Sequence, residues 1–182
     1  TSDGKGWVKD YTLEELRAFN YNRTKPEYKH ADIPTMREVF ELLKPTGLFI
    51  NIEIKTGVVF YEKIEEKILA LTMGMEDRVC YSSFNHYTVT RIHELKPDAE
   101  VGFLYADGPI DMPSYGVKHG VNALHPALYN LQYDGFVKEC KEKGLKLNVW
   151  TVNERPYMEM CCQYGVDAII TNYPDIAKEV VG

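Results

Sequence analysis

A glycine followed at once by an apolar residue recurs along this chain of 182 residues. The pairs are Gly47-Leu48, Gly120-Val121, Gly144-Leu145 and Gly165-Val166. Glycine ends a helix readily because it adopts left-handed backbone angles, and the apolar run after each pair is typical of a strand. The four pairs therefore predict junctions at which a helix ends and a strand begins.

Strands alternate with helices from about residue 48 to the end of the chain. The apolar runs that read as strands are centred near residues 52, 80, 103, 123, 148 and 169. This spacing of about 20 to 30 residues suits strand–helix–strand units, which are right-handed and build a parallel sheet covered by helices. Residues 111–119 are expected to make a poor helix, because they contain Pro113 and Gly116.

The first of these strands has one apolar and one polar face. Ile50, Ile52 and Ile54 alternate with Asn51, Glu53 and Lys55, and successive side chains of a strand point to opposite faces. An open doubly wound sheet has helices on both faces and so favours two apolar faces. A polar face fits the interior of a (β/α)8 barrel better, so we expect an α/β barrel. Six strands would leave that barrel incomplete.

The composition limits the classes of function that this chain can have. The length suits one domain with a sizeable core, and no apolar run is long enough to predict a transmembrane segment. The net charge of −6 argues against a nucleic-acid partner. The four cysteines show neither zinc spacing nor a disulfide framework. A cytoplasmic location is expected, although any secretion signal would lie upstream of Thr1.

Polar residues at the carboxyl ends of the predicted strands are the candidates for chemistry, since barrel enzymes place their sites there. Glu53 has the oxygen ligands that a hard divalent cation prefers, and Lys55 provides a point charge for a phosphate. Ser83, His125 and Trp150 are candidate substrate-binding residues at other strand ends. Each has a plain structural alternative: Ser83 caps the next helix, His125 bonds a backbone carbonyl, and Trp150 belongs to the core.

The chain resembles the glycerophosphodiester phosphodiesterase family along almost its whole length. The order and spacing of the matching segments carry the resemblance. These segments are Asp3-Gly4-Lys5-Gly6, Tyr11-Thr12-Leu13-Glu14-Glu15-Leu16, Ile33-Pro34-Thr35-Met36-Arg37-Glu38-Val39, Asn51-Ile52-Glu53-Ile54-Lys55, Ser82-Ser83-Phe84-Asn85, Val149-Trp150-Thr151-Val152-Asn153 and Gly165-Val166-Asp167-Ala168-Ile169-Ile170-Thr171-Asn172-Tyr173-Pro174.

The resemblance implies a TIM-barrel hydrolase of lipid and glycerol metabolism. Such an enzyme cleaves a small-molecule glycerophosphodiester to glycerol 3-phosphate and an alcohol, with the help of Mg²⁺ or Ca²⁺. By the same resemblance Glu53 is one ligand of the metal, Lys55 contacts the phosphate, and Trp150 faces the glycerol or the leaving alcohol. Residues 1–32 correspond to the end of the family's small insertion, and residues 33–182 correspond to part of the barrel.

The sequence also departs from the family pattern. The family's first-strand His-Arg motif, its Glu-x-Asp metal ligands and its second catalytic histidine precede the part that this chain matches. None of the five histidines stands in such a motif, so no catalytic residue is assigned. We therefore expect strands three to eight of the barrel, weak metal binding at Glu53, and no turnover by this chain alone. A symmetry partner in a homo-oligomer, or a missing N-terminal segment, would complete the barrel.

Two alternatives stay open. The first is a non-catalytic module, derived from a barrel, that binds a phosphorylated ligand or a protein. The second is a related lyase or phospholipase of the sphingomyelinase D group, which would leave a cyclic phosphate.

Overall fold

The computed structural model describes residues 2–182 and divides the chain into two compact units, Thr1–Leu48 and Phe49–Gly182. Each unit is described by itself below. The contacts place the division after Leu48, whereas the resemblance placed the end of the family's insertion at residue 32. The latter boundary stays a prediction, because contacts do not report which part of the chain corresponds to an insertion.

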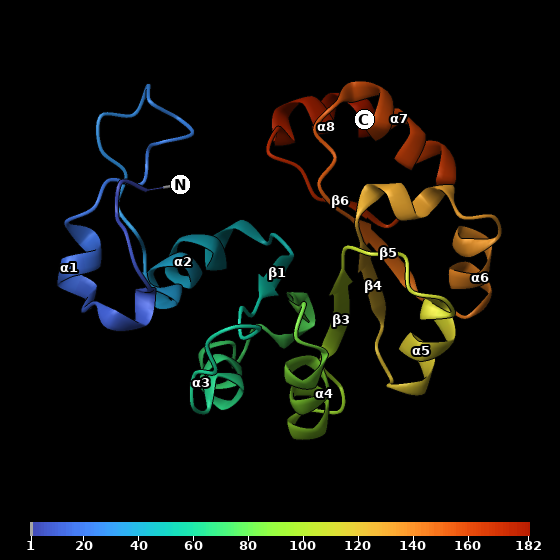
Figure 1. Ribbon diagram of the computed structural model, residues 1–182, viewed down its shortest axis with the longest axis horizontal. Coiled ribbons are helices and arrows are strands. Elements are labelled where there is room, and N and C mark those ends of the chain that lie inside the picture. The colour runs from blue at the N-terminus through green and yellow to red at the C-terminus, as the bar shows by residue number, and fades with distance from the viewer. Residues whose placement is uncertain (1) are drawn as a thin grey trace. The chain divides into compact units, whose positions relative to one another are not determined.

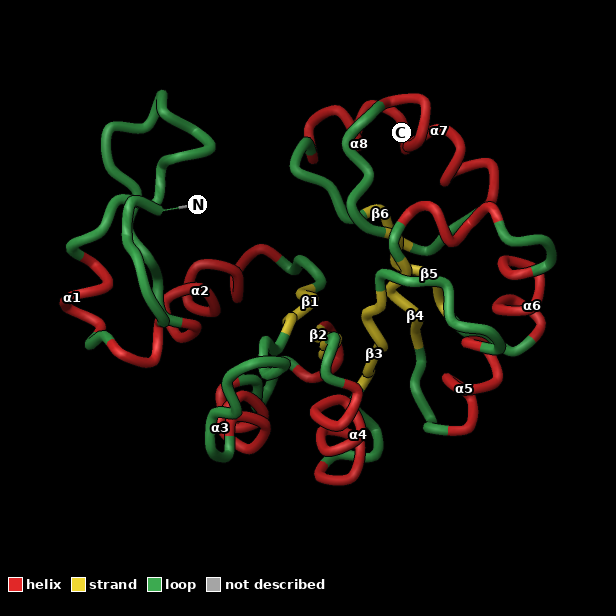
Figure 2. Tube along the Cα trace, viewed as in Figure 1, coloured by secondary structure: helices red, strands yellow, loops and turns green. Residues whose placement is uncertain are grey.

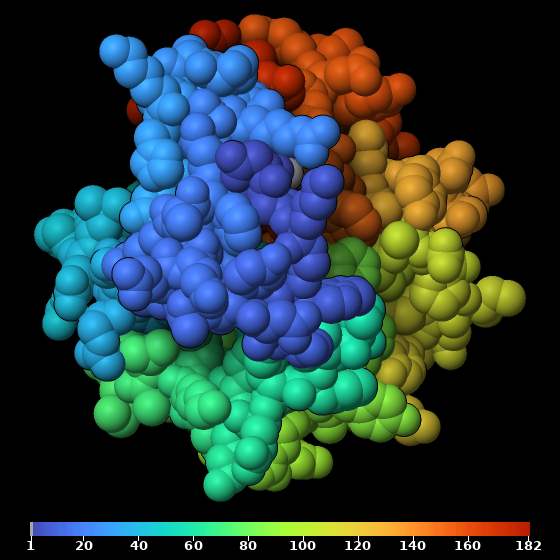
Figure 3. All heavy atoms as spheres, turned by 60° about the vertical axis from the view of Figure 1, so that its left-hand side comes forward, coloured from blue at the N-terminus to red at the C-terminus, as the bar shows by residue number. Residues whose placement is uncertain are grey.

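The N-terminal unit is built from short helices. They are η1 (Val8–Asp10), α1 (Leu13–Arg17), α2 (Met36–Leu43) and η2 (Lys44–Thr46). Both α1 and α2 begin with a complete capping box, Thr12 with Glu15 and Thr35 with Glu38, which satisfies backbone amides that the first helical turn leaves unpaired. Arg17 of α1 forms an ion pair with Glu38 of α2 at 2.6 Å. Figure 3 shows the described atoms of this unit in colours that run from blue to cyan.

The second unit is built on one sheet of six parallel strands in the order of the sequence. Its strands are β1 (Ile50–Glu53), β2 (Val79–Ser83), β3 (Glu100–Tyr105), β4 (Ala123–Pro126), β5 (Lys146–Val149) and β6 (Ala168–Ile169). Each strand pairs with the next one along the chain, as right-handed strand–helix–strand units require. The predicted parallel α/β sheet is confirmed, with β1 and β6 as the two edges of the described sheet.

Helices follow the strands and lie around the sheet (Figures 1 and 2). They are α3 (Ile64–Leu71), α4 (His86–Leu95), α5 (Met112–Lys118), α6 (Phe136–Glu142), α7 (Arg155–Tyr164) and α8 (Pro174–Val181), with the short turns η3 (Glu76–Arg78) and η4 (Leu128–Gln132). The expectation of a poor helix over 111–119 was wrong. Pro113 lies in the first turn of α5, where its missing amide hydrogen costs nothing, and Gly116 is buried against Leu124.

The sheet is curled, and its two faces differ. Phe103 and Val101 of β3 are completely buried, whereas Asn51 and Glu53 of β1 are exposed on the face opposite Ile50 and Ile52. The alternating faces predicted for β1 are therefore confirmed, and the architecture is that of six strands of a TIM-like barrel rather than of a doubly wound sheet. The four predicted junction glycines all have positive φ. Among residues 2–182 no helix combines the length and the apolar character needed to cross a bilayer.

Candidate functional site

Glu53 and Lys55 lie together at the carboxyl end of β1. The Lys55 Nζ is 2.6 Å from the Glu53 Oε1. The Lys55 side chain remains 78% exposed and that of Glu53 32% exposed. A pair this exposed adds little to stability. Lys55 is therefore free to exchange its partner for the oxygen atoms of a bound anion.

Ser83 holds the segment that carries Lys55 in place by hydrogen bonds. Its hydroxyl donates to the Ile54 carbonyl at 2.5 Å and accepts the Asn85 amide hydrogen at 3.0 Å. The Asn85 side chain in turn donates to the Thr56 carbonyl at 3.3 Å. Ser83 is buried and already has both partners, so its assignment to substrate binding stays a prediction.

An aromatic pair lies at the carboxyl ends of β2 and β5. The Trp150 Nε1–H donates to the His125 carbonyl at 2.8 Å. The ring of Phe84 meets the ring of Trp150 edge to face, with centroids 5.3 Å apart and planes at 84°, a favourable geometry for such rings. Phe84 is half exposed and was not assigned from the sequence. The sequence feature that could have pointed to Phe84 is its position directly after a strand that ends in two serines.

His125 is completely buried in β4. Its Nε2 is 2.9 Å from the Asn148 Nδ2, and among the described residues its Nδ1 has no hydrogen-bond partner. Burial lowers the pKa of His125 to about 4, so the imidazole is neutral at pH 7. The predicted contact of this residue with substrate stays a prediction.

The polar face of the sheet borders a cavity of about 440 Å³. Its lining combines polar side chains with a few apolar ones: Phe49, Asn51, Cys80, Glu100, His125, Lys146, Asn148, Asp167, Ala168 and Ile170. The Lys146 Nζ donates to the Glu100 Oε1 at 2.8 Å, and the Asp167 carboxylate accepts the Leu147 amide hydrogen at 2.8 Å. Glu100 and Lys146 thus satisfy each other at the amino ends of β3 and β5, and Asp167 in front of β6 is satisfied by a backbone amide.

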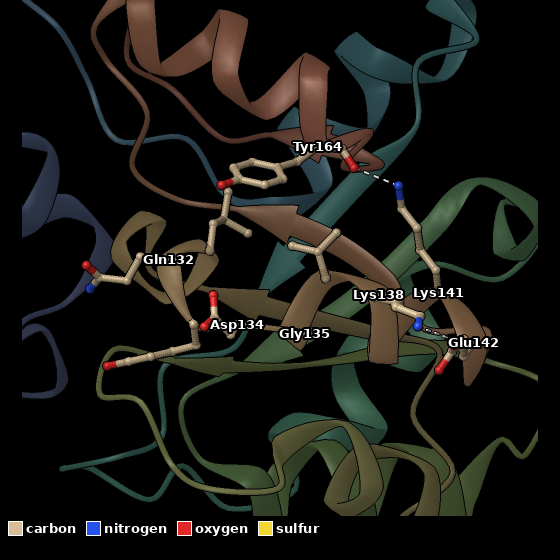
Figure 4. A pocket seen from close by; sticks show the side chains of 10 residues that line it. Gln132, Asp134, Gly135, Lys138, Lys141, Glu142 and Tyr164 are labelled. Atoms are coloured by element: carbon tan, nitrogen blue, oxygen red, sulfur yellow. Dashed lines mark hydrogen bonds and ion pairs between the residues drawn. The ribbon is translucent and has the colours of Figure 1, made fainter.

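Two further cavities lie outside this polar face. One, of about 460 Å³, is drawn in Figure 4 and is bordered by residues of η4, α6 and α7, among them Leu131, Gln132 and Tyr164. The Lys141 Nζ there donates to the Tyr164 carbonyl at 2.6 Å. The second, of about 650 Å³, shares those three residues and reaches Trp150. None of the three cavities includes Glu53 or Lys55; of the candidate residues, His125 lines the cavity of about 440 Å³ and Trp150 lines the cavity of about 650 Å³.

The described residues do not by themselves form a metal centre. Within residues 2–182 no three His, Cys, Asp or Glu side chains lie close enough together to hold a metal ion. A hard cation needs several oxygen ligands, and Glu53 offers one carboxylate that is already bound to Lys55. His86 stacks on Phe103 at a centroid distance of 4.0 Å and bonds the Leu104 carbonyl through its Nε2, so packing explains it.

Comparison with known proteins gives a consistent family. The glycerophosphoryl diester phosphodiesterase family model matches residues 1–176. A glycerophosphodiester phosphodiesterase of Caldanaerobacter subterraneus subsp. tengcongensis is 37% identical, with 100% of this chain and 75% of that protein covered. One of Bacillus altitudinis is 34% identical, over 99% of this chain and 76% of that protein.

Solved structures agree on the fold. A putative glycerophosphoryl diester phosphodiesterase of Silicibacter pomeroyi superposes with a TM-score of 0.86 at 21% identity, covering 100% of this chain and 71% of that one. An Oleispira antarctica phosphodiesterase, solved with its product sn-glycerol-3-phosphate, gives 0.81 at 23% identity, covering 100% and 74%. The chain belongs to the glycerophosphoryl diester phosphodiesterase family.

Proposed function

We propose that this protein serves the hydrolysis of glycerophosphodiesters to glycerol 3-phosphate and an alcohol. The observation that carries the proposal is the 37% identity, across the whole chain, with a protein named glycerophosphodiester phosphodiesterase. The exposed lysine at the carboxyl end of β1 adds chemical support, because a phosphodiester carries one negative charge that an ammonium group can bind.

Lys55 acts on the phosphate in this proposal. In the reaction a water oxygen forms a bond to phosphorus, the bond from phosphorus to the alcohol oxygen breaks, and the alcohol leaves with a proton. Negative charge grows on the phosphoryl oxygens during the attack, and a fixed positive charge beside them lowers the barrier. Lys55 can turn from Glu53 toward those oxygens, because its side chain is largely exposed. No proton transfer is assigned to a described residue.

Trp150 and Phe84 form the apolar side of the site in this proposal. Their edge-to-face contact presents ring carbons at the rim, against which the carbon backbone of glycerol or the leaving alcohol can pack. Burying apolar area of the substrate there is worth about 25 cal/mol per Å². The pair would therefore orient the diester while Lys55 holds its phosphate.

Glu53 is the residue proposed for a divalent cation, Mg²⁺ or Ca²⁺. Since a single carboxylate does not make a metal centre, we expect weak binding and derive no chemical step from the ion. Calorimetric titration of Mg²⁺ and Ca²⁺ into wild-type protein and Glu53→Gln tests this part. We expect a dissociation constant in the millimolar range that Glu53→Gln abolishes; submicromolar binding, or binding unchanged by Glu53→Gln, would contradict it.

The main test measures binding and turnover side by side. Purified chain 1–182 is titrated with glycerol 3-phosphate by calorimetry and incubated with glycerophosphocholine and Mg²⁺ or Ca²⁺. We expect saturable binding that Lys55→Met weakens at least tenfold, and no hydrolysis above a buffer control. The expectation of no hydrolysis rests on Glu53 as a lone carboxylate, because no group of three metal-ligating side chains lies among residues 2–182.

The products distinguish the alternatives. Efficient hydrolysis to glycerol 3-phosphate would refute the claim that this chain lacks turnover, while a cyclic phosphate would identify a lyase. No binding of glycerol 3-phosphate at millimolar concentration would contradict the proposed function itself.

A further inference from the structure

We infer that His125 is a positioning residue, which fixes Trp150 at the rim of the site through a network of Gly102, His125, Asn148 and Trp150. This inference, called the His125 network below, rests on the proposed function for the role of Trp150. In this inference His125 affects substrate binding only through Trp150, because the imidazole itself is completely buried.

The network lies where the hydrogen bonding between β4 and β5 is interrupted. The paired positions stop at Leu124 and Leu147, and the pairing resumes as an isolated bridge between Ala127 and Trp150. The Leu128 amide donates to the Trp150 carbonyl at 2.7 Å. Pro126, two residues earlier, has no amide hydrogen with which to repeat that bond. The Trp150 amide itself donates to the Pro126 carbonyl at 3.1 Å, so the ladder lacks only one bond, the one that an amide hydrogen at position 126 would donate toward Asn148.

His125 connects β4 to the chain around Trp150 through two hydrogen bonds. Its side-chain Nε2 lies 2.9 Å from the Asn148 Nδ2, two residues before Trp150. Its backbone carbonyl accepts the Trp150 indole N–H at 2.8 Å. One residue of β4 thus holds the side chain of Asn148 in β5 and that of Trp150 directly after β5, and a shift of the His125 backbone would move the indole with it.

Gly102 of β3 makes room for the imidazole. A methyl group at that position would overlap the His125 Nε2 and Cδ2 and lie 3.3 Å from the Ala123 carbonyl. Its φ is not in the left-handed region, so the need for glycine is one of space rather than of backbone angle. The buried ring cannot move into solvent, and Gly102→Ala is therefore a second way to disturb the same network from a different strand.

The protonation state of His125 gives a signature that can be read in the unaltered protein. Because the amide nitrogen of Asn148 donates to Nε2, the neutral ring carries its proton on Nδ1. Long-range ¹⁵N–¹H correlation spectra distinguish the two tautomers. We expect the Nδ1–H tautomer at pH 7. Comparable populations of the two tautomers, as in a ring without a fixed partner, would overturn the network.

The positioning role is tested by hydrogen exchange of the indole protons. The chain has two tryptophans, Trp7 and Trp150, so the indole region of a ¹⁵N–¹H spectrum has two resonances. In Asn148→Ala and in Gly102→Ala we expect the Trp150 indole N–H to exchange at least tenfold faster, with that of Trp7 unchanged. Glycerol 3-phosphate affinity should fall five- to tenfold in both.

Asn122→Ala is the matched control. Asn122 in front of β4 accepts the Val101 amide hydrogen at 2.9 Å, so this variant also loses one asparagine hydrogen bond between neighbouring strands. We expect it to change exchange of the Trp150 indole less than twofold at matched global stability. Equal acceleration in Asn122→Ala, or no acceleration in either network variant, would overturn the inference.

The exchange and tautomer measurements need no ligand, so they decide the positioning role separately from the proposed function. If wild-type protein fails to bind glycerol 3-phosphate while the exchange results hold, the proposed function fails and the network stands.

Discussion

Two regions of the sheet carry an acid and a lysine in contact, and they differ in what the contact does. At the carboxyl end of β1, Glu53 and Lys55, two residues further along the chain, are 2.6 Å apart, with Lys55 78% and Glu53 32% exposed. At the amino ends of β3 and β5, Glu100 and Lys146 are 2.8 Å apart across the sheet, with Lys146 49% and Glu100 24% exposed. The hydrogen bond to Glu100 raises the pKa of Lys146.

The difference separates polar groups that satisfy each other from polar groups that remain available to a ligand. Glu100, Lys146, His125 and Asn148 connect different strands, so their contacts belong to the folded sheet. Glu53 and Lys55 are neighbours in the chain, so their contact joins no elements and can be given up without unfolding. Changes in the first group should therefore reduce stability, and changes at Lys55 should reduce binding.

The largest effect is expected on the free energy of unfolding at acid pH, where His125 resists protonation in the folded protein. With a folded pKa of about 4 against an ordinary value of 6.5, His125 stays neutral below pH 6.5 while the unfolded chain takes up a proton. The free energy of unfolding should thus fall by about 1.4 kcal/mol per pH unit below 6.5, about 3 kcal/mol in all by pH 4.

Urea denaturation at pH 7.5, 6.0, 5.0 and 4.5 measures this loss. Burial also lowers the pKa of His86, although the Leu104 carbonyl partly opposes the shift, so His86 acts in the same direction. His125→Gln should show a flatter pH profile than wild-type protein. A profile as steep as that of wild-type protein would show that His125 does not titrate as its burial predicts.

The next effect is expected at Lys55. Lys55→Met should weaken glycerol 3-phosphate binding at least tenfold, because the point charge for the phosphate is lost. Its unfolding midpoint should stay within a degree of that of wild-type protein, since an exposed ion pair contributes little. Calorimetry checks the loss of binding, and thermal denaturation checks the unfolding midpoint. A large loss of stability would show that Lys55 stabilises the fold, as Glu100 and Lys146 do.

The smallest effect is expected at Lys146. Lys146→Met should lower the free energy of unfolding by about 1 kcal/mol, as for a partly exposed pair, with glycerol 3-phosphate binding unchanged. Since the folded pKa of Lys146 is raised above 10.5, this stabilisation is fully present at neutral pH and disappears as the pH rises above that value. A double-mutant cycle with Glu100→Gln measures the pair, and a coupling near zero would contradict its role in joining β3 and β5.

The sequence predicts the order of helices and strands because that order follows from local rules. Glycine junctions and the alternation in β1 each need a few neighbouring residues, and the structure confirms them. Residues 111–119 show the limit of such rules. Propensity argued against a helix there, but Pro113 lies in the first turn and packing accommodates Gly116.

The site was predicted in part for the same reason. Glu53 and Lys55 are two residues apart, so the period of a strand places them together. The bond between His125 and Asn148 joins residues 23 apart, and that between Glu100 and Lys146 joins residues 46 apart. Such partners depend on which strands become neighbours and on their register. No local pattern carries that information, and the contact of Phe84 with Trp150 was missed for the same reason.

Titration of glycerol 3-phosphate into wild-type protein, Lys55→Met and Lys146→Met tests the separation of the two regions most directly. The account predicts that binding is weakened at least tenfold by Lys55→Met and is unchanged by Lys146→Met, although the second variant is the less stable one. Equal losses of affinity in both variants, or a loss in Lys146→Met alone, would contradict it.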